Sequence, residues 1–459
     1  MKRILRRLLV GLGIGLGVIV GSIGLTLAGW HLLDGAPSVP EAIPAVNTFD
    51  ATRLLVLADA DMAATAYADG LLYPMEGEQD ALIVLSDLTA DNPTRIQAEA
   101  SNTVMGWPGA TTVSADGTLA YVTAGRGMVD DIEQVSSVRE GMPITRTLTT
   151  IDLVTGDVLS EVDVCVEPMS VDIASTGTWL LIACRDIDNE LTIVPLIDGL
   201  PGDVRAFDLE VSSPPQRPDA TPGATYSVIH PSGQAAGVIL NDTAVTLARF
   251  ELDANGIPIS VVAETPELYT DRWLSVARWT RSGNHLLVAD VAWGPRPTDA
   301  VLNGNGAILS LALSPEDEAR GLISEATVSK SPEAFEMNRT GDLLAVVNME
   351  RTYLPGGPLS LVPARGASSL SLVGVDDATG ILTTYGEPVG FRGVLPEDAV
   401  FDADGDQIAV VIYQDHDAPR SNGWLSFFDV DRSGVEPTLT LTDRQIDLPR
   451  GAHDLAIVD

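Results

Sequence analysis

Charged and amide side chains recur in this chain directly after short apolar segments, and their types could bind a ligand or do chemistry. Carboxylates and histidine can transfer protons or hold a metal ion, and arginine pairs with anionic groups. If these segments end at one place, the side chains form a mixed polar ring suited to a small molecule or a metal. The candidate ligand-binding residues are Arg126, Arg185, Asp186, Asn241, Asp290, Asn348, Glu350, Arg351, Asp415 and His416.

Three of these residues could activate water for hydrolysis, so Asp290, Glu350 and His416 are the catalytic candidates. The sequence has no Gly-x-Ser-x-Gly, His-Glu-x-x-His or Cys-x-x-Cys-His motif, which argues against nucleophilic, zinc-protease and c-type cytochrome chemistry. A site assembled from distant repeats would leave no linear motif. Whether the protein is an enzyme therefore stays open.

Two acidic segments raise the question of a metal ion. Asp402–Asp406 has acids at alternate positions, as in a calcium loop, but it coincides with a turn of the repeat described below, so we interpret it as turn chemistry. Asp415-His416-Asp417 could ligate a divalent cation, yet no second histidine is near in sequence. We predict no metal site and no cofactor, with a divalent cation as the weaker alternative.

A repeated turn must position these residues. Asp, Ser or Thr followed by Gly occurs seven times before a short apolar strand, with the glycines 47 to 64 residues apart: Gly70, Gly117, Gly177, Gly233, Gly283, Gly341 and Gly405. This period is typical of a propeller or an array. A further strand recurs in alternation with the turn, from Leu82–Asp87 to Leu425–Phe428. We therefore predict an all-β fold, a seven-bladed β-propeller of four-stranded antiparallel blades over residues 51–459.

The turn His230-Pro-Ser-Gly233 and the strand Leu148–Gly156, which ends Ile-Asp-x-x-Thr-Gly, resemble the YVTN-type propeller repeat. The wider group includes seven-bladed lactonase-like propellers similar to 6-phosphogluconolactonase. The resemblance implies the fold and, as an alternative function, hydrolysis of a small lactone. No motif of the chain matches the catalytic residues of the lactonases, so none is transferred, and the turns of blades one, three and five lack the proline.

Two features of the predicted propeller bear on its site. Ala452–Val458 reads as a first strand that would complete the first blade, although Met62–Ala66 could take the same place. Four connections between second and third strands are long and unequal, and such loops concentrate binding residues on one face: Gly125–Arg146, Ala292–Gly306, Met349–Ala367 and Gln414–Gly423. The alternative is that these are ordinary surface loops around a solvated polar channel.

The N-terminal segment predicts export. Lys2, Arg3, Arg6 and Arg7 precede an uncharged run over residues 8–29 that is long enough to span a membrane, and basic residues before it place the rest of the chain outside the cytoplasm. We favour an uncleaved anchor in contact with the membrane through residues 8–29; the alternative is a signal peptide over residues 1–29, cut after Ala28, and a secreted protein. Residues 30–50 form a proline-containing extracytoplasmic linker.

The amino-acid composition limits the kinds of partner that the protein can bind. The chain has 64 acidic and 27 basic residues, a net charge of −37, which disfavours binding to nucleic acid. Cys165 and Cys184 should end strands on one face of adjacent blades and form a disulfide, or else remain two buried thiols. We predict a membrane-tethered or secreted binding module in the periplasm or at the cell surface. Its partner is an envelope protein or a small molecule, and the alternative function is a lactone hydrolase.

Overall fold

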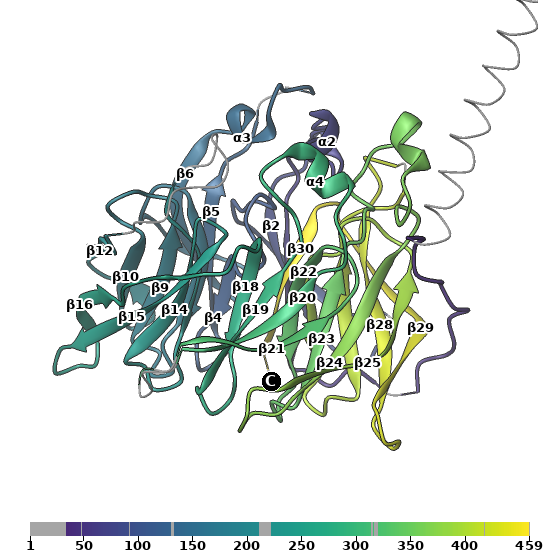
Figure 1. Cartoon of the computed structure of the whole chain (residues 1–459). Coiled ribbons are helices and arrows are strands. Elements are labelled where there is room, and N and C mark those ends of the chain that lie inside the picture. Colours follow the sequence, from purple (N-terminus) through teal and green to yellow (C-terminus); the bar gives the residue numbers. More distant parts are fainter. Residues whose placement is uncertain are drawn as a thin grey trace, which may run out of the picture.

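The computed structural model describes residues 34–46, 48–90, 92–129, 133–210, 222–313, 315, 320–416 and 418–458. Within these ranges the strands form seven antiparallel sheets around a common axis (Figure 1). The sheets are the blades of a seven-bladed propeller, as the repeated turns predict. The predicted N-terminal helix and its cleavage site lie outside the described residues, and no helix in the described ranges is long and apolar enough to cross a membrane.

Each blade has four main strands, and the innermost strands of successive blades contact one another around the axis. From the axis outwards, blade 1 consists of β30 (Ala452–Val458), β1 (Arg53–Ala58), β2 (Ala81–Ser86) and β3 (Thr94–Glu99), and blade 2 of β4 (Thr111–Val113), β5 (Leu119–Arg126), β6 (Ile144–Asp152) and β7 (Val158–Asp163). Blade 3 consists of β8 (Pro168–Ile173), β9 (Trp179–Cys184), β10 (Leu191–Ile197) and β11 (Leu200–Pro201), and β12 (Arg205–Phe207) also pairs with β10. Blade 4 consists of β13 (Ala224–Ile229), β14 (Ala235–Leu240), β15 (Ala244–Leu252) and β16 (Pro258–Ala263), and β17 (Leu268–Tyr269) also pairs with β15.

In the same order, blade 5 consists of β18 (Leu274–Trp279), β19 (His285–Asp290), β20 (Ala307–Ala312) and β21 (Gly321–Thr327). Blade 6 consists of β22 (Pro332–Met337), β23 (Leu343–Asn348), β24 (Ser368–Val375) and β25 (Leu382–Phe391). Blade 7 consists of β26 (Ala399–Phe401), β27 (Gln407–Ile412), β28 (Gly423–Asp431) and β29 (Thr438–Leu448). Short helices lie in connections from second to third strands: α2 (Ala66–Asp69), α3 (Val138–Gly141), α4 (Pro297–Val301) and the 3-10 helix η1 (Gly357–Leu361). We call the face with these connections the loop-bearing face.

Six of the seven predicted turns join a first strand to a second. Gly405 is typical, with a φ of 74°, and the Asp402 carboxylate accepts the backbone N–H groups of Asp406 and Gln407. The carboxylate is thus occupied by turn hydrogen bonds, in agreement with the interpretation of this segment as a turn. The seventh assignment is wrong: Asp69-Gly70 ends helix α2 in the β1–β2 connection, because a glycine with φ of 70° serves a helix end as well as a turn.

The C-terminal strand β30 completes blade 1. It pairs antiparallel with β1, with Val56 opposite Leu455, and contacts β4 of blade 2 on its other side. Met62–Ala66, the alternative, forms no strand and lies in the β1–β2 connection. Blade 1 is therefore made from the two ends of the propeller sequence.

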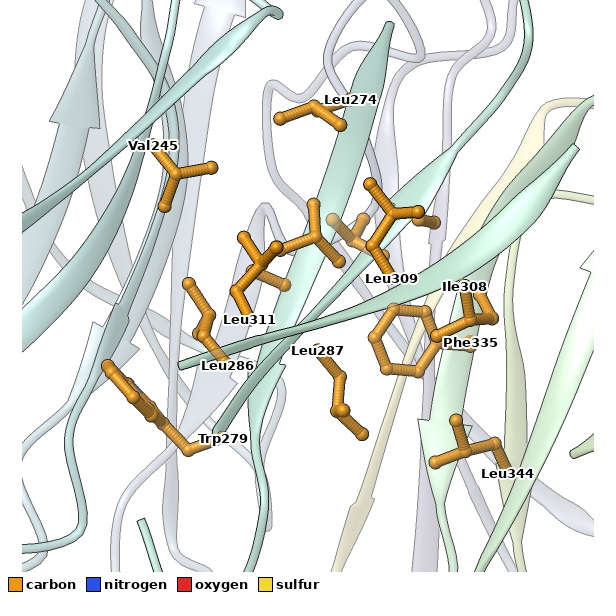
Figure 2. Close-up of a cluster of buried hydrophobic side chains, with 14 of the residues drawn as sticks. Val245, Leu274, Trp279, Leu286, Leu287, Ile308, Leu309, Leu311, Phe335 and Leu344 are labelled. Carbon is orange, nitrogen blue, oxygen red and sulfur yellow. The ribbon is translucent and has the colours of Figure 1, made fainter. Parts of the chain in front are cut away.

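The hydrophobic core lies between neighbouring blades. Second strands such as β9 are buried along their whole length, because the sheets on both sides cover them, whereas the outer strand β7 has no fully buried residue. Figure 2 shows one such cluster, in which Leu286 and Leu309 of blade 5 pack between blades 4 and 6 with Val245 and Phe335. Seven similar interfaces make a rigid ring, so the loop-bearing face has a fixed frame.

The segment before blade 1 runs along the outside of the ring. The backbone of Ile43 hydrogen-bonds to Leu441 and Asp443 beside β29, and the Asp34 carboxylate pairs with Lys330 at 2.7 Å and Arg351 at 2.6 Å. Asp34 therefore lies at the loop-bearing face of blade 6.

Candidate functional site

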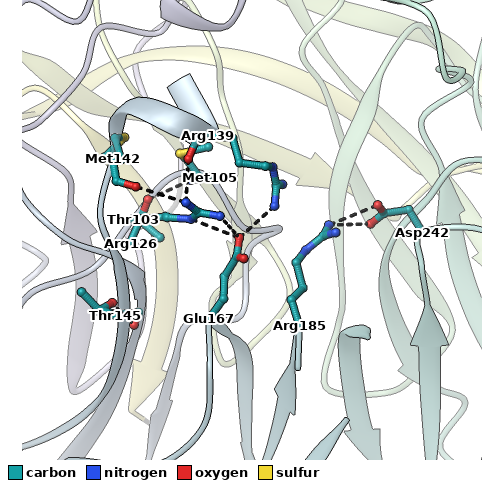
Figure 3. A network of polar contacts seen from close by, with 10 residues as sticks. Thr103, Met105, Arg126, Arg139, Met142, Thr145, Glu167, Arg185 and Asp242 are labelled. Carbon is teal, nitrogen blue, oxygen red and sulfur yellow. Dashed lines mark hydrogen bonds and ion pairs between the residues drawn. The ribbon is translucent and has the colours of Figure 1, made fainter. Parts of the chain in front are cut away.

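The predicted site residues all lie near the loop-bearing face, but most are bound to other side chains or to the backbone. Figure 3 shows three ion pairs of this kind. Arg126 and Arg139 both contact the Glu167 carboxylate, at 2.9 and 2.8 Å, and Arg185 donates to Asp242 at 3.1 Å. Arg126, Glu167, Arg185 and Asp242 are almost fully buried, so their ion pairs fix the ends of neighbouring blades, while Arg139 is partly exposed.

The three catalytic candidates lie on separate blades and have separate partners. Asp290 of blade 5 accepts the Trp273 backbone N–H and pairs with Arg272 at 3.0 Å. Glu350 of blade 6 accepts the Ser369 hydroxyl at 2.8 Å, and His416 lies half-buried in the loop after β27. No contact joins the three among the described residues, so the structure does not bring them together as a catalytic group.

The other predicted residues also have local partners. The Asp186 carboxylate accepts the Val166 backbone N–H, Asn241 accepts the Gly223 N–H, and Asn348 donates to the hydroxyls of two serines of β24. Arg351 donates to Asn303 and Asp34, and Asp415 pairs with Arg392 at 2.9 Å. Asp417 lies outside the described residues.

The long loops do not leave an open rim, because they pack into one apolar cluster, which we call the apolar cap. Its buried residues come from the loops of blades 1, 2, 6 and 7 and from the crossings between blades: Met62, Ala64, Ala66, Leu72, Val104, Val129, Val138, Met142, Met349, Tyr353, Leu354, Val362, Val394, Leu395 and Tyr413. The loops are also hydrogen-bonded to one another, since the Tyr413 hydroxyl donates to the Met62 carbonyl at 2.5 Å and the Tyr353 hydroxyl to the Ala300 carbonyl at 2.7 Å. The cap closes this end of the axis.

Beneath the cap, titratable groups from three blades share a buried polar cluster. Glu333 begins blade 6, Glu397 precedes β26 of blade 7, and His453 lies on β30 of blade 1. The His453 Nδ1 lies 4.0 Å from the Glu397 carboxylate, and each of the three side chains is at most 4% exposed. Burial raises the pKa of Glu333 to about 8, and burial together with the charge of Glu333 raises the pKa of Glu397 well above its usual value.

Other buried acids at the same ends are structural. The Asp454 carboxylate accepts the backbone N–H groups of Gly109 and Thr111, and the Asp398 carboxylate accepts the Leu455 N–H at 3.0 Å. Each acid thus joins the innermost strand of one blade to the next. Their hydrogen-bond capacity is used to hold the ring.

A cluster of three aspartates in blade 1 was missed by the sequence analysis. Asp59 and Asp61 directly follow β1, and Asp80 directly precedes β2. One carboxylate oxygen from each lies within 4.8 Å of the other two, which is a spacing that can hold a metal ion. Backbone N–H groups fix the outer pair: Asp59 accepts those of Asp61 and Val104 at 2.8 and 3.0 Å, and Asp80 accepts that of Ala60 at 2.9 Å.

Asp61 differs from its two neighbours. It is 1% exposed, and neither of its carboxylate oxygens has a hydrogen-bond partner in the described part of the chain. The Val129 backbone N–H is near enough to lower the pKa of this carboxylate but does not form a hydrogen bond with it. Burial and the charges of Asp59 and Asp80 raise its pKa to about 9, against the opposing charge of Arg450. Burial also raises the pKa of Asp80, to about 8.

Beside this cluster, a groove of about 790 Å³ lies between blades 1 and 7. Ala58, Ala60 and Ala81 form its floor next to the aspartates, and Arg450 joins its two sides by donating to the carbonyls of Tyr73 and Pro419. The remaining polar lining comes from the blade 1 loop, β3 and the end of blade 7: Glu78, Gln79, Arg95, Gln97, Glu99, Asn422 and Asp447. A second cavity, of about 400 Å³, lies at the opposite end of the axis, among the far ends of β4, β22, β26 and β30.

The fold defines a seven-bladed β-propeller of four-stranded blades, and known structures agree. A putative 6-phosphogluconolactonase from Bacteroides fragilis superposes with a TM-score of 0.56 at 13% identity, over 89% of this chain and 98% of that chain. One from Bacteroides uniformis gives 0.55 at 14% identity, over 89% and 100%. A hypothetical selenium-binding protein from Sulfolobus tokodaii gives 0.53 at 9% identity, over 89% and 93%.

At these identities the likeness concerns the fold alone. No protein-family model matches the chain, so the YVTN family is not confirmed. No curated protein sequence matches it either.

Proposed function

We propose that this chain is a ligand-binding propeller held outside the cytoplasm, and that a small polar molecule occupies the groove between blades 1 and 7. The observation that carries the proposal is the groove itself. Its volume of about 790 Å³ falls in the range of about 300–1,000 Å³ found for small-molecule sites. It lies at the edge of the loop-bearing face and is lined by none of the ten predicted ligand-binding residues, while the apolar cap covers the centre of that face.

One wall of the groove comes from alternate positions of an outer strand. Arg95, Gln97 and Glu99 are exposed on one side of β3, and the intervening Ala98 is buried on the other. Guanidinium, amide and carboxylate groups in a row suit a ligand with several hydroxyl or amine groups. The charged lining residues carry one net negative charge, which favours a neutral or cationic molecule over a phosphorylated one: Glu78, Arg95, Glu99, Asp447 and Arg450.

Two further observations support the position of the propeller outside the cytoplasm and its orientation toward the membrane. Cys165 and Cys184 form a disulfide with Cα atoms 6.1 Å apart, and disulfides persist in oxidising compartments outside the cytoplasm. Asp34, which follows the apolar run over residues 8–29, is held at the loop-bearing face by Lys330 and Arg351. In the anchored form this face and its groove are turned toward the membrane, where an envelope protein would meet them.

The test uses the full chain in detergent. Thermal-shift screening against neutral, cationic and phosphorylated polar molecules, and against envelope extracts, finds the ligand. We expect it to bind at least about tenfold more weakly when Arg95, Gln97 and Glu99 are all replaced by alanine, about 1.4 kcal/mol. The matched control replaces the exposed Leu159, Glu161 and Asp163 of β7. A ligand that binds the β3 variant and the control equally would place the site elsewhere.

A second candidate is a lactone hydrolase, as the fold of the two putative 6-phosphogluconolactonases suggests. One observation favours it: Glu333, Glu397 and His453 converge from three blades. A lactone would reach them only if the apolar cap opened. Turnover of any lactone in a panel assayed with and without EDTA, lost in Glu397→Gln, would replace the binding proposal. No turnover, together with a groove ligand, would end the hydrolase hypothesis.

A further inference from the structure

Asp59, Asp61 and Asp80 have an arrangement that their role in the fold does not explain. Asp59 and Asp80 each accept backbone N–H groups and so hold the ends of the β1–β2 loop in place. Asp61 makes no such contact, although its carboxylate is 1% exposed and faces the other two. An unpaired polar group is costly to bury, so the fold needs a counterpart for this side chain.

The counterpart must be positive. Three carboxylates surround the position, and Arg450 is the cation that acts on Asp59 and Asp61 among the described residues. Its guanidinium is already bound to the carbonyls of Tyr73, Pro419 and Ala60. A carboxylate must be ionised to bind a metal ion. With all three ionised, three negative charges and one positive charge leave a balance of −2, which one divalent cation would neutralise.

The spacing fits a hard cation. Oxygens on opposite sides of a Ca²⁺ ion, each about 2.4 Å away, are about 4.8 Å apart. The three aspartate oxygens lie within 4.8 Å of one another, so a single ion can contact all three. Carboxylate ligands without histidine or cysteine favour Ca²⁺, Mg²⁺ or Mn²⁺ over zinc or copper.

We propose that Asp59, Asp61 and Asp80 bind one hard divalent cation, Ca²⁺ in the first place, and that the ion fixes the long loop of blade 1 against the propeller. The loop contributes Met62, Ala64 and Leu72 to the apolar cap and Glu78 to the groove. The ion therefore supports both surfaces without touching the groove ligand. The proposal does not depend on that ligand and is tested without it.

The experiment is a calorimetric titration of the EDTA-treated full chain in detergent with CaCl₂, and with MgCl₂ and MnCl₂ in parallel. We expect saturable binding of one ion per chain and a rise in melting temperature on binding. Asp61→Asn should bind at least about a hundredfold more weakly, since the variant loses one of the three carboxylate charges that attract the ion. Asp404→Asn, which alters an exposed acid of the calcium-like turn, should bind as the natural chain does.

Hydrogen exchange on the natural chain locates the ion even if Asp61→Asn does not fold. We expect the amides of Ala60, Asp61 and Val104, which hydrogen-bond to the ligand carboxylates, to become more protected when Ca²⁺ is added. No saturable binding of any of the three ions would overturn the proposal. So would unchanged affinity in Asp61→Asn, or protection confined to other segments.

Discussion

The pKa of His453 leads to a prediction that tests the buried cluster under the cap. The imidazole is 2% exposed, and burial lowers its pKa to about 3. Its Nε2 lies 2.8 Å from the Asn102 side-chain oxygen, and the Asn102 amide nitrogen donates to the carbonyls of Ala58 and Ala100. The Asn102 oxygen is therefore an acceptor, so Nε2 carries the proton and Nδ1 faces Glu397 without one.

The sign and size of the effect follow from proton linkage. Below about pH 6.5 the histidine is protonated in the unfolded chain but stays neutral in the folded chain, so protonation favours the unfolded chain. Stability is present above this pH and is lost as the pH falls toward about 3. Between about pH 7.5 and about pH 5 the free energy of unfolding should fall by about 2 kcal/mol because of His453 alone.

The assay is urea unfolding of the full chain, followed by tryptophan fluorescence at both pH values. His453→Gln keeps a donor for Asn102 and removes the titration. We expect the natural chain to lose about 2 kcal/mol more than this variant over the interval. Equal losses would show that His453 does not titrate as described. A smaller loss in the natural chain would mean that a charged His453 pairs with an ionised Glu397, and would refute the assignment of protons.

Three further predictions concern stability. The raised pKa of Glu333 gives stability that is fully present below about pH 4.5 and is lost as the pH rises through about 8. Glu333→Gln should therefore reduce the fall in melting temperature over this pH range, which a scan of melting temperature against pH measures. Reduction of the disulfide, or replacement of Cys165 and Cys184 by serine, should lower the free energy of unfolding by about 3 kcal/mol in the chain-entropy model, since the bridge spans 19 residues. Urea unfolding with and without dithiothreitol measures this loss, and equal midpoints would contradict the prediction. Gly451→Ala should cost more than about 2 kcal/mol, because its φ is 87° and a Cβ there would meet a backbone oxygen of the blade 1 loop at 1.7 Å. Gly233→Ala, with φ of 70° and nothing within 4 Å, is the control that carries only the backbone strain, and equal melting temperatures for the two would refute the clash.

The fold was predictable because its signals are local. Each turn glycine, such as Gly117 or Gly341, adopts a positive φ directly before a buried second strand, and sequence shows both. Pairing across the ring is less local: the pattern of β30 made it a candidate for blade 1, but only the structure decides between it and Met62–Ala66. Gly70 misled because sequence does not distinguish a glycine that ends a helix from one that makes a turn.

That single error also hid the aspartate cluster. Asp59 and Asp61 stand at alternate positions directly after β1, the same position as the candidates of the other blades. Placing the turn at Gly70 shifted the frame of blade 1, so β1 was not recognised as a second strand. Asp80 lies at the far end of the loop, and only the folded chain brings it within reach of Asp61.

The arrangement of the predicted polar ring was beyond sequence reasoning for a different reason. Whether Arg126 faces solvent or an acid depends on Glu167, which begins a different blade. The apolar cap likewise depends on contacts among loops that are far apart in the chain, such as those of Met62 and Tyr413. Contacts of this kind between distant residues decide whether the polar side chains at a strand end are available to bind a ligand or hold neighbouring blades together.

The completion of blade 1 by β30 sets the timing of assembly. A chain emerging from the ribosome or crossing a membrane has β1 available early, but the strand that lies between β1 and the axis is made about 400 residues later. The groove and the aspartate loop need Arg450 and the Gly451 carbonyl, which hydrogen-bonds to the Asp59 N–H. Both therefore form in the last step, and a molecule stalled before that step would expose the edge of β1 instead of a binding site.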